Sequence, residues 1–255
     1  MENIVFPASI QKIIGSMPVL SENVGRSGAF VAYIGDELVL KRTEKGQLQN
    51  AQKMQTFLSG YGLAPEVVHF ETGDFDYMIS KKALGRSAID REYRREPRRL
   101  ARALGEFLLK IHSLPVGQCP VSGLTDKWIS DFYAAVDKTD GVYKHISEYL
   151  GIETLSKAKE IVNENAAFLA SDTVLHGDYC LPNVMLTDFE AKHAIDLGEG
   201  GVGDRHFDLF WGLWSLSYNL KTDAYGDDFL SAYGKKSVNK DLIVTCGCLC
   251  APDGF

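Results

Sequence analysis

The sequence lacks a hydrophobic run long enough to cross a membrane. Its longest mostly apolar stretch, LFWGLWSLSYNL at residues 209–220, contains polar residues and is shorter than the roughly 20 residues of a transmembrane helix. The amino terminus places the acidic Glu2 before any apolar stretch and lacks the basic segment that begins a secretory signal. We therefore expect a soluble, cytoplasmic protein with no membrane partner.

A disulfide framework is also absent. Five cysteines, an odd number, are spread over 255 residues, and a chain of this length can build a core without covalent cross-links. Three of them form the pattern CGCLC at residues 246–250, which has neither two CxxC pairs nor the histidines of a zinc site. We therefore interpret Cys246, Cys248 and Cys250 as small buried hydrophobic residues in a reduced protein.

Basic residues are in the minority. The 27 Lys and Arg residues against 34 Asp and Glu residues leave a net charge of -7, which makes nucleic acid a poor partner and favours a cationic ligand. The hydrophobic content of 45% and charged content of 24% are those of an ordinary globular protein, so the composition excludes an intrinsically disordered chain.

The first eighty residues predict a small antiparallel sheet that carries one helix. The runs FVAYI and ELVLK flank the Gly35-Asp36 pair, a strong hairpin signal, and Lys41 ends the second run. The runs PEVVHFE and DYMIS flank residues 72–74 and predict a second hairpin. Between the two, apolar residues at helical spacing predict a helix over residues 46–58.

From about residue 83 the pattern becomes helical. Apolar residues that recur every three to four positions predict helices over residues 97–111, 128–136, 143–150, 155–169, 207–220, 224–233 and 240–249. Residues 173–197 are the exception, with the β-type runs VLH, NVML and HAID. We therefore predict an α+β fold with a β-rich lobe at residues 1–82 and a larger, mainly helical lobe at residues 83–255.

The segment HGDYCLPN, followed by a hairpin and IDLG, places Asp178, Asn183 and Asp196 in a chemically useful arrangement. If NVML and HAID pair as antiparallel strands, Asn183 just before the first strand and Asp196 late in the second lie side by side. An amide and a carboxylate oxygen, together with phosphate oxygens, suit Mg²⁺. Asp178 precedes the hairpin, where it can accept a proton from a hydroxyl group. The same spacing of base and metal-binding Asn occurs in the kinase catalytic loop.

HGDxxxxN followed by DLG resembles the aminoglycoside phosphotransferase family, with HGD and DLG where protein kinases carry HRD and DFG. The resemblance extends along nearly the whole chain, through LHGDYCLPNVML, AIDLGEGGVGDRHFDL, VLK at residues 39–41, GLAPEVVHFE and GEFLLKIHSLP. Among subfamilies the chain is most similar to the 3′-phosphotransferases. The resemblance implies a protein-kinase-like two-lobe fold and Mg²⁺-dependent transfer of the ATP γ-phosphate to a sugar hydroxyl of kanamycin-like drugs, which leads to antibiotic resistance.

The resemblance also implies roles for individual residues of the nucleotide and catalytic sites. Asp178 would be the catalytic base, and Asn183 and Asp196 would be the metal ligands. Lys41 would bind the α- and β-phosphates. Ser27, in the turn GRSGA, would contact phosphate, although an ordinary β-turn explains this segment equally well. The sequence has no GxxxxGK[ST] motif, so P-loop chemistry is not expected.

The drug itself calls for acidic groups, since an aminoglycoside carries several ammonium groups. The resemblance assigns Asp253 and the carboxylate of Phe255, in the terminal APDGF, to substrate binding, and a frayed acidic tail is the alternative. Glu199 replaces the Arg that often follows IDxG in the family, and it could bind an ammonium group directly.

Three further expectations concern residues around the motif. The resemblance suggests that His176 anchors the backbone of the catalytic loop, and that Asp208 caps the following helix and braces the same loop. Trp211 and Trp214 are interpreted as helix core.

Ala51 stands where the family carries the Glu that pairs with Lys41, so a weakly active nucleotide-binding protein is one alternative function. The other is a kinase of a different small-molecule hydroxyl on the same fold.

Overall fold

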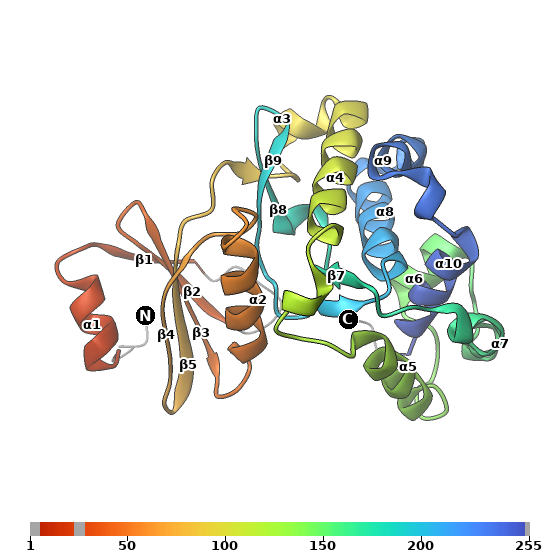
Figure 1. Cartoon of the computed structure of the whole chain (residues 1–255), viewed down its shortest axis with the longest axis horizontal. Coiled ribbons are helices and arrows are strands. Elements are labelled where there is room, and N and C mark those ends of the chain that lie inside the picture. The colour runs from red at the N-terminus through yellow and green to blue at the C-terminus, as the bar shows by residue number, and fades with distance from the viewer. Residues whose placement is uncertain (1–5, 23–28, 253–255) are drawn as a thin grey trace.

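The computed structural model describes residues 6–22 and 29–252 and divides into a β-rich lobe and a larger helical lobe (Figure 1). The first lobe contains a five-stranded antiparallel sheet with strand order β1-β2-β3-β5-β4. Its strands are β1 (Val19–Glu22), β2 (Phe30–Ile34), β3 (Leu38–Glu44), β4 (Val67–Thr72) and β5 (Phe75–Lys81). Helices α1 (Ala8–Ile14) and α2 (Gln49–Ser59) lie on opposite sides of this sheet (Figure 1).

Both predicted hairpins are confirmed. β2 and β3 pair in antiparallel register around Gly35, whose φ of 57° is the left-handed conformation that the turn requires. β4 and β5 pair on either side of residues 73–74.

Alternation along β3 decides which side chains face the second lobe. Leu40 is buried and lies opposite Ile79, and both pack in the cluster that contains Ile10 of α1. The next residue, Lys41, lies opposite Met78, whose side chain packs with α2. Because successive residues of a strand point to opposite faces, burying Leu40 under α1 directs Lys41 toward the helical lobe.

The second lobe is mainly helical. Its α-helices are α3 (Arg91–Arg94), α4 (Pro97–His112), α5 (Leu124–Ala135), α6 (Lys144–Leu150), α7 (Leu155–Asn165), α8 (His206–Leu220), α9 (Gly226–Tyr233) and α10 (Lys240–Leu249). Short 3-10 turns are η1 (Val116–Gln118), η2 (Ala166–Phe168), η3 (Leu181–Asn183) and η4 (Lys235–Ser237). Among the helices of the described ranges, none combines the length and the apolar character that a bilayer span requires.

Two small sheets interrupt the helices, and all their strands except β6 (Arg86–Ser87) lie within residues 173–203, where the β-type runs occur. β8 (Val184–Thr187) pairs with β9 (Glu190–Ala194) and with the short β6, while β7 (Thr173–Leu175) pairs with β10 (Gly201–Gly203). The turn between β8 and β9 holds two non-glycine residues with positive φ, Asp188 and Phe189, as a tight hairpin turn requires. The sequence analysis did not predict α3, β6 or β10.

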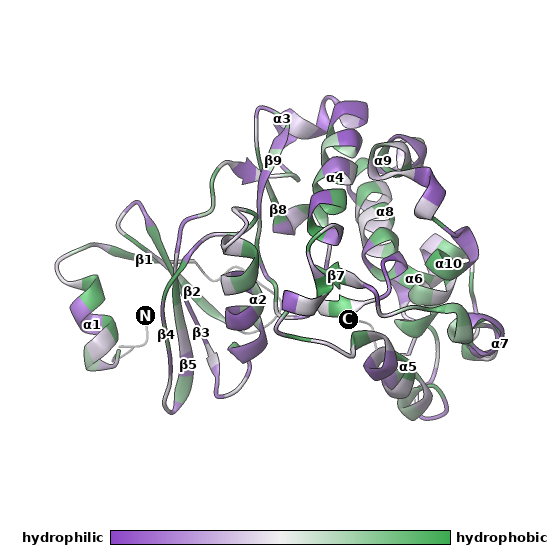
Figure 2. Cartoon of the chain, viewed as in Figure 1, coloured by the Kyte–Doolittle hydropathy of each residue, from purple (hydrophilic) through white to green (hydrophobic). Residues whose placement is uncertain are grey.

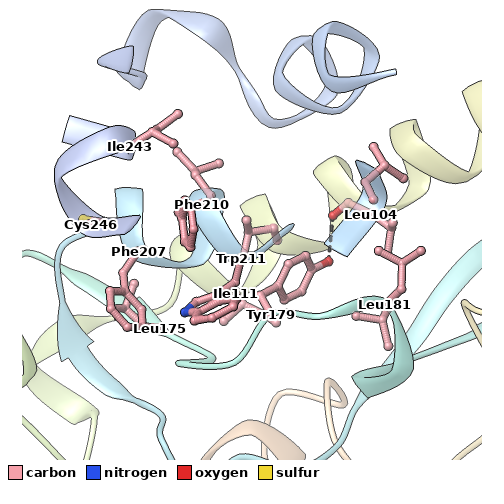
Figure 3. Close-up of a cluster of buried hydrophobic side chains, with 14 of the residues drawn as sticks. Leu104, Ile111, Leu175, Tyr179, Leu181, Phe207, Phe210, Trp211, Ile243 and Cys246 are labelled. Carbon is pink, nitrogen blue, oxygen red and sulfur yellow. Dashed lines mark hydrogen bonds between the residues drawn. The ribbon is translucent and has the colours of Figure 1, made fainter. Parts of the chain in front are cut away.

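One large hydrophobic cluster holds the second lobe together, and apolar ribbon concentrates around β7 and α10 in Figure 2. Phe207, Phe210 and Trp211 of α8 pack there between the loop after β7 and α10 (Figure 3). The expected burial of Trp211 is confirmed, and Trp214 is partly buried against the same cluster. Cys246, Cys248 and Cys250 are buried as predicted. Leu175, Tyr179, Leu181 and Leu197 belong to this same core, so it anchors the loops that carry the predicted site residues.

The contact between α4 and α9 generates a prediction about stability. A Cβ at Gly105, in the middle of α4, would overlap the backbone carbonyl of Phe229 in α9. Gly105→Ala should therefore lower the free energy of unfolding by about 1–3 kcal/mol, the usual cost of overpacking, although alanine favours a helix by about 1 kcal/mol. Urea unfolding measures the change. Gly117→Ala is the control, because a Cβ there meets no atom within 4 Å. Equal stability of the two variants would contradict the proposed close packing.

Candidate active site

The segment 176–183 between β7 and β8, called the catalytic loop below, and the β8–β9 hairpin bring Asp178, Asn183 and Asp196 together. The Asn183 Nδ2 atom donates to the Asp178 Oδ2 atom at 2.8 Å and to the Asp178 carbonyl at 3.0 Å. Ile195 N donates to the Asn183 carbonyl at 2.9 Å, which extends the hairpin ladder to the residue before Asp196. The predicted pairing is thus confirmed, although β9 ends at Ala194 and Asp196 follows it with a φ of 61°. Asp178 is half-buried and Asp196 is exposed.

A buried carboxylate holds the first part of the catalytic loop. Asp208 is fully buried, and its two oxygens accept the backbone N–H groups of His176 at 2.7 Å and Gly177 at 2.8 Å. The expected brace is confirmed. The expected helix cap is wrong, because α8 begins at His206, its N-cap Arg205 has no side-chain cap bond, and Asp208 lies inside the first turn.

His112 is a third partner of this carboxylate that the sequence analysis missed. Its Nε2 atom lies 3.0 Å from Asp208 Oδ2, and its Nδ1 atom lies 2.8 Å from the hydroxyl of Tyr233. Burial lowers the pKa of His112 more than the neighbouring Asp208 raises it, so the ring is neutral near pH 7. The neutral ring then donates from Nε2 to the carboxylate and accepts the Tyr233 hydroxyl at Nδ1. The motif GEFLLKIHSLP contains His112, but no spacing rule links it to a residue 96 positions later.

Other side chains fix the rest of the loop. The His176 ring lies 3.0 Å from the Ile195 carbonyl through Nε2 and accepts Asp178 N at 3.2 Å, as expected of a loop anchor. The buried Tyr179 donates its hydroxyl to the Leu104 carbonyl of α4 at 2.7 Å (Figure 3). Leu181 N donates to the Ser215 hydroxyl of α8 at 2.9 Å. The loop is therefore attached to α4, α8 and the hairpin at once.

Lys41 joins the two lobes. Its Nζ atom lies 2.6 Å from Asp196 Oδ1, with 22% of the Lys41 side chain and 50% of the Asp196 side chain exposed. Helix α2 contains no acidic residue, and Ala51 is buried on its face toward the cavity that Lys41 lines. In this structure the lysine therefore has its acidic partner in the second lobe.

A cavity of about 410 Å³ lies between the lobes. The sheet contributes Val31, Tyr33, Val39, Lys41 and Met78, and the second lobe contributes Pro182, Asn183, Met185, Asp196 and Leu197. Residues 80–83 line it where the chain passes from one lobe to the other. The cavity is thus apolar at Val31, Val39 and Met78 of the sheet and polar at Lys41, Asn183 and Asp196.

The donor set fits Mg²⁺ better than a metal held by protein alone. Within residues 6–22 and 29–252, no group of three or more His, Cys, Asp or Glu side chains is arranged to hold a metal. Asn183 and Asp196 line the cavity with one amide and one carboxylate. Mg²⁺ is commonly held by one or two carboxylates together with phosphates and water, so this set suits a metal that arrives with a nucleotide.

The remaining predicted residues are less fully placed. Glu199 is exposed in the loop after Asp196, and its side chain does not line the cavity. Ser27, Asp253 and Phe255 lie outside the described residues.

Comparisons with known proteins agree with this geometry. The sequence model of the phosphotransferase enzyme family matches residues 24–241. A probable aminoglycoside 3′-phosphotransferase of Lactococcus lactis is 35% identical over 173 residues, which cover 68% of this chain and 66% of that protein. An aminoglycoside 3′-phosphotransferase of Niallia circulans is 24% identical over 250 residues and covers 93% and 94%.

A solved structure confirms the kinase-like fold. The aminoglycoside phosphotransferase APH(3″)-Id of Streptomyces rimosus superposes with a TM-score of 0.76 at 20% identity and covers 94% of both chains. The β-rich first lobe and helical second lobe of this chain are those expected from the sequence. Together, a family match over most of the sequence, the fold, and Asn183 and Asp196 of the two motifs at one cavity show that this chain belongs to the phosphotransferase enzyme family, among relatives that include aminoglycoside 3′-phosphotransferases.

Proposed function

We propose that this protein transfers the γ-phosphoryl group of ATP to the 3′-hydroxyl of aminoglycoside antibiotics, and that the modification inactivates the drugs. The observation that carries the proposal is the convergence of Lys41, Asn183 and Asp196 at one interlobe cavity, with Asp178 hydrogen-bonded to Asn183. Relatives named aminoglycoside 3′-phosphotransferases support the acceptor class. Net charge of -7 is consistent with a cationic acceptor and argues against nucleic acid.

The nucleotide would occupy the interlobe cavity. A related structure is described as a complex with ADP and streptomycin, and another as a complex with AMP-PNP and hygromycin B. We propose that Lys41 positions the α- and β-phosphates and that Ser27 contributes a further phosphate contact. The Lys41–Asp196 pair is partly exposed and so contributes little to stability, which leaves both groups able to rearrange around a nucleotide. On this view residues 1–82 form the nucleotide-binding lobe, and residues 83–255 form the catalytic and substrate-binding lobe.

Asn183 and Asp196 would hold Mg²⁺, whose chemistry in phosphoryl transfer is to neutralise charge on the phosphate oxygens. Asp178 would orient the drug hydroxyl and accept its proton as the oxygen attacks the γ-phosphorus and the bond to the leaving ADP oxygen breaks. The bond from Asn183 holds one oxygen of Asp178, so the carboxylate has a fixed direction before any acceptor binds. Because ATP is an intracellular nucleotide, we assign the protein to the cytoplasm.

Acidic groups would bind the ammonium groups of the drug. We propose Glu199, Asp253 and the terminal carboxylate of Phe255 for this role. Glu199 is exposed three residues after Asp196, so its side chain is available to a ligand next to the phosphates.

A second acceptor position has its own support. A streptomycin 3″-kinase of Streptomyces griseus is 29% identical over 206 residues and covers 74% of both chains. Transfer to a 3″-hydroxyl is therefore the alternative that the test must separate from transfer to the 3′-hydroxyl.

The acceptor test measures ADP release by the purified protein with ATP, Mg²⁺ and one candidate acceptor at a time. Kanamycin should support turnover, while tobramycin, which lacks the 3′-hydroxyl, should support little. Asp178→Ala should lower turnover by about 100-fold or more because the proton acceptor is lost, and ATP affinity should stay within about twofold. Glu190→Ala is the matched control. This exposed carboxylate lies at the turn of the β8–β9 hairpin, at the opposite end from Asn183 and Asp196, and it pairs with Lys192.

Several outcomes would contradict the proposal. Turnover with streptomycin alone would favour the 3″ position, and turnover with choline or homoserine alone would favour another acceptor class. Full activity of Asp178→Ala would remove that residue from the mechanism.

His112 generates a prediction about pH. The pKa of this buried ring lies below the ordinary 6.5, so the unfolded chain takes up a proton at a higher pH than the folded protein does. Stability therefore falls as the pH drops below about 6.5, by up to about 1.4 kcal/mol per pH unit from this group. His112→Gln removes the titration and should flatten the dependence of the free energy of unfolding between pH 7 and pH 5.5. His193, whose pKa burial also lowers, contributes equally to both proteins. Identical slopes in urea unfolding would contradict this account.

A further inference from the structure

Helix α2 contacts residues 198–200, which follow the proposed metal ligand Asp196, through a residue that the sequence analysis did not single out. Asn50, adjacent to Ala51, extends its side chain from the first lobe to the segment that follows Asp196. Its Nδ2 atom donates to the carbonyl of Gly198 and, at 3.1 Å, to the carbonyl of Gly200. One amide group therefore holds two carbonyls of the opposite lobe with its two N–H bonds.

The two carbonyls belong to the loop at residues 196–200. If the proposed function is correct, this loop carries both a metal ligand, Asp196, and a substrate-binding residue, Glu199. The two carbonyls flank Glu199, and Gly198 lies two residues after Asp196. Gly200 N donates to the Leu197 carbonyl at 3.2 Å, which closes a tight turn between them. A group that holds both carbonyls therefore limits the movement of Asp196 on one side and Glu199 on the other.

The opposite side of this loop packs against the catalytic loop. A Cβ at Gly177, whose φ is 88°, would overlap the Glu199 carbonyl. Only glycine permits so close an approach in that backbone conformation. The segment 196–200 is thus enclosed between Asn50 of α2 and the backbone that immediately precedes Asp178.

We infer that Asn50 is a positioning residue that couples helix α2 to the metal-binding and catalytic loops. The inference rests on the proposed phosphoryl transfer for its consequence, although the physical link itself does not. In protein kinases an ion pair between the β3 lysine and a helix glutamate connects the corresponding elements. Here Lys41 pairs with Asp196, α2 has no acidic residue, and a neutral amide holds the loop instead.

The chemistry of the contact specifies an amide. Alanine at position 50 removes both bonds and leaves the two carbonyls without this donor. An aspartate of the same size places an oxygen against two carbonyl oxygens, so Asn50→Asp should disturb the loop at least as much as Asn50→Ala. The pair of variants separates loss of the bonds from loss of side-chain volume.

The direct test is hydrogen–deuterium exchange of the metal-free protein. Backbone amides of residues 194–203 should exchange faster in Asn50→Ala and Asn50→Asp than in the wild type. Gln52→Ala is the matched control, because Gln52 is an amide on the same helix whose side chain donates to the Thr56 hydroxyl at 3.1 Å. Unchanged exchange in both Asn50 variants would overturn the inference whether or not the wild type phosphorylates a drug.

Kinetics test the consequence. Both Asn50 variants should lower kcat with kanamycin by about 10-fold and raise the Mg²⁺ concentration for half-maximal activity, as loss of an outer-shell contact does at metal sites. Affinity for Mg²⁺-free ADP should stay unchanged, because the apolar part of the cavity is intact. A purely structural role would lower the melting temperature and leave kcat and the Mg²⁺ requirement at wild-type values below it, which would also overturn the positioning role. An inactive wild type with the predicted exchange pattern would instead count against the proposed function alone.

Discussion

The site depends first on one buried carboxylate. Asp208 has no exposed surface, and burying a charged group is costly unless hydrogen bonds replace its water. The backbone N–H groups of His176 and Gly177 and the ring of neutral His112 supply those bonds. The same bonds that make the buried Asp208 tolerable fix the backbone that leads into Asp178. The core of the second lobe therefore determines the backbone position of Asp178, with no need for a bound ligand.

A second constraint is the stacking of three backbone segments at the cleft. The catalytic loop, the segment 196–200 and helix α2 lie against one another, through the close approach at Gly177 and the bonds of Asn50. Lys41 adds a bond from β3 to Asp196. The two lobes are thus connected at the groups that would bind the phosphates and the metal. A change in lobe orientation would for this reason be transmitted directly to Asp178 and Asp196.

Local patterns predicted what depends on local physics. The Gly35-Asp36 turn, the helical periodicity after residue 97 and the interval between Asn183 and Asp196 correspond to hairpins and helices that form from neighbouring residues. Contacts between distant segments were out of reach: nothing in the spacing of His112 or Asn50 indicates a partner 96 or 148 positions away. The family resemblance suggested that Asp208 both caps α8 and braces the catalytic loop, and only the brace is present, because both carboxylate oxygens accept N–H groups of that loop. Short strands such as β6 and β10 exist only through their partners, so no periodicity marks them.

The central claim is that this site phosphorylates one defined hydroxyl of an aminoglycoside. The most direct measurement is two-dimensional ¹H–³¹P NMR of the product formed from kanamycin, ATP and Mg²⁺. The account predicts a single new phosphorus signal that correlates with the proton at the 3′ carbon. A phosphorus signal that correlates with any other ring proton, or no phosphorylated drug at all, would contradict it.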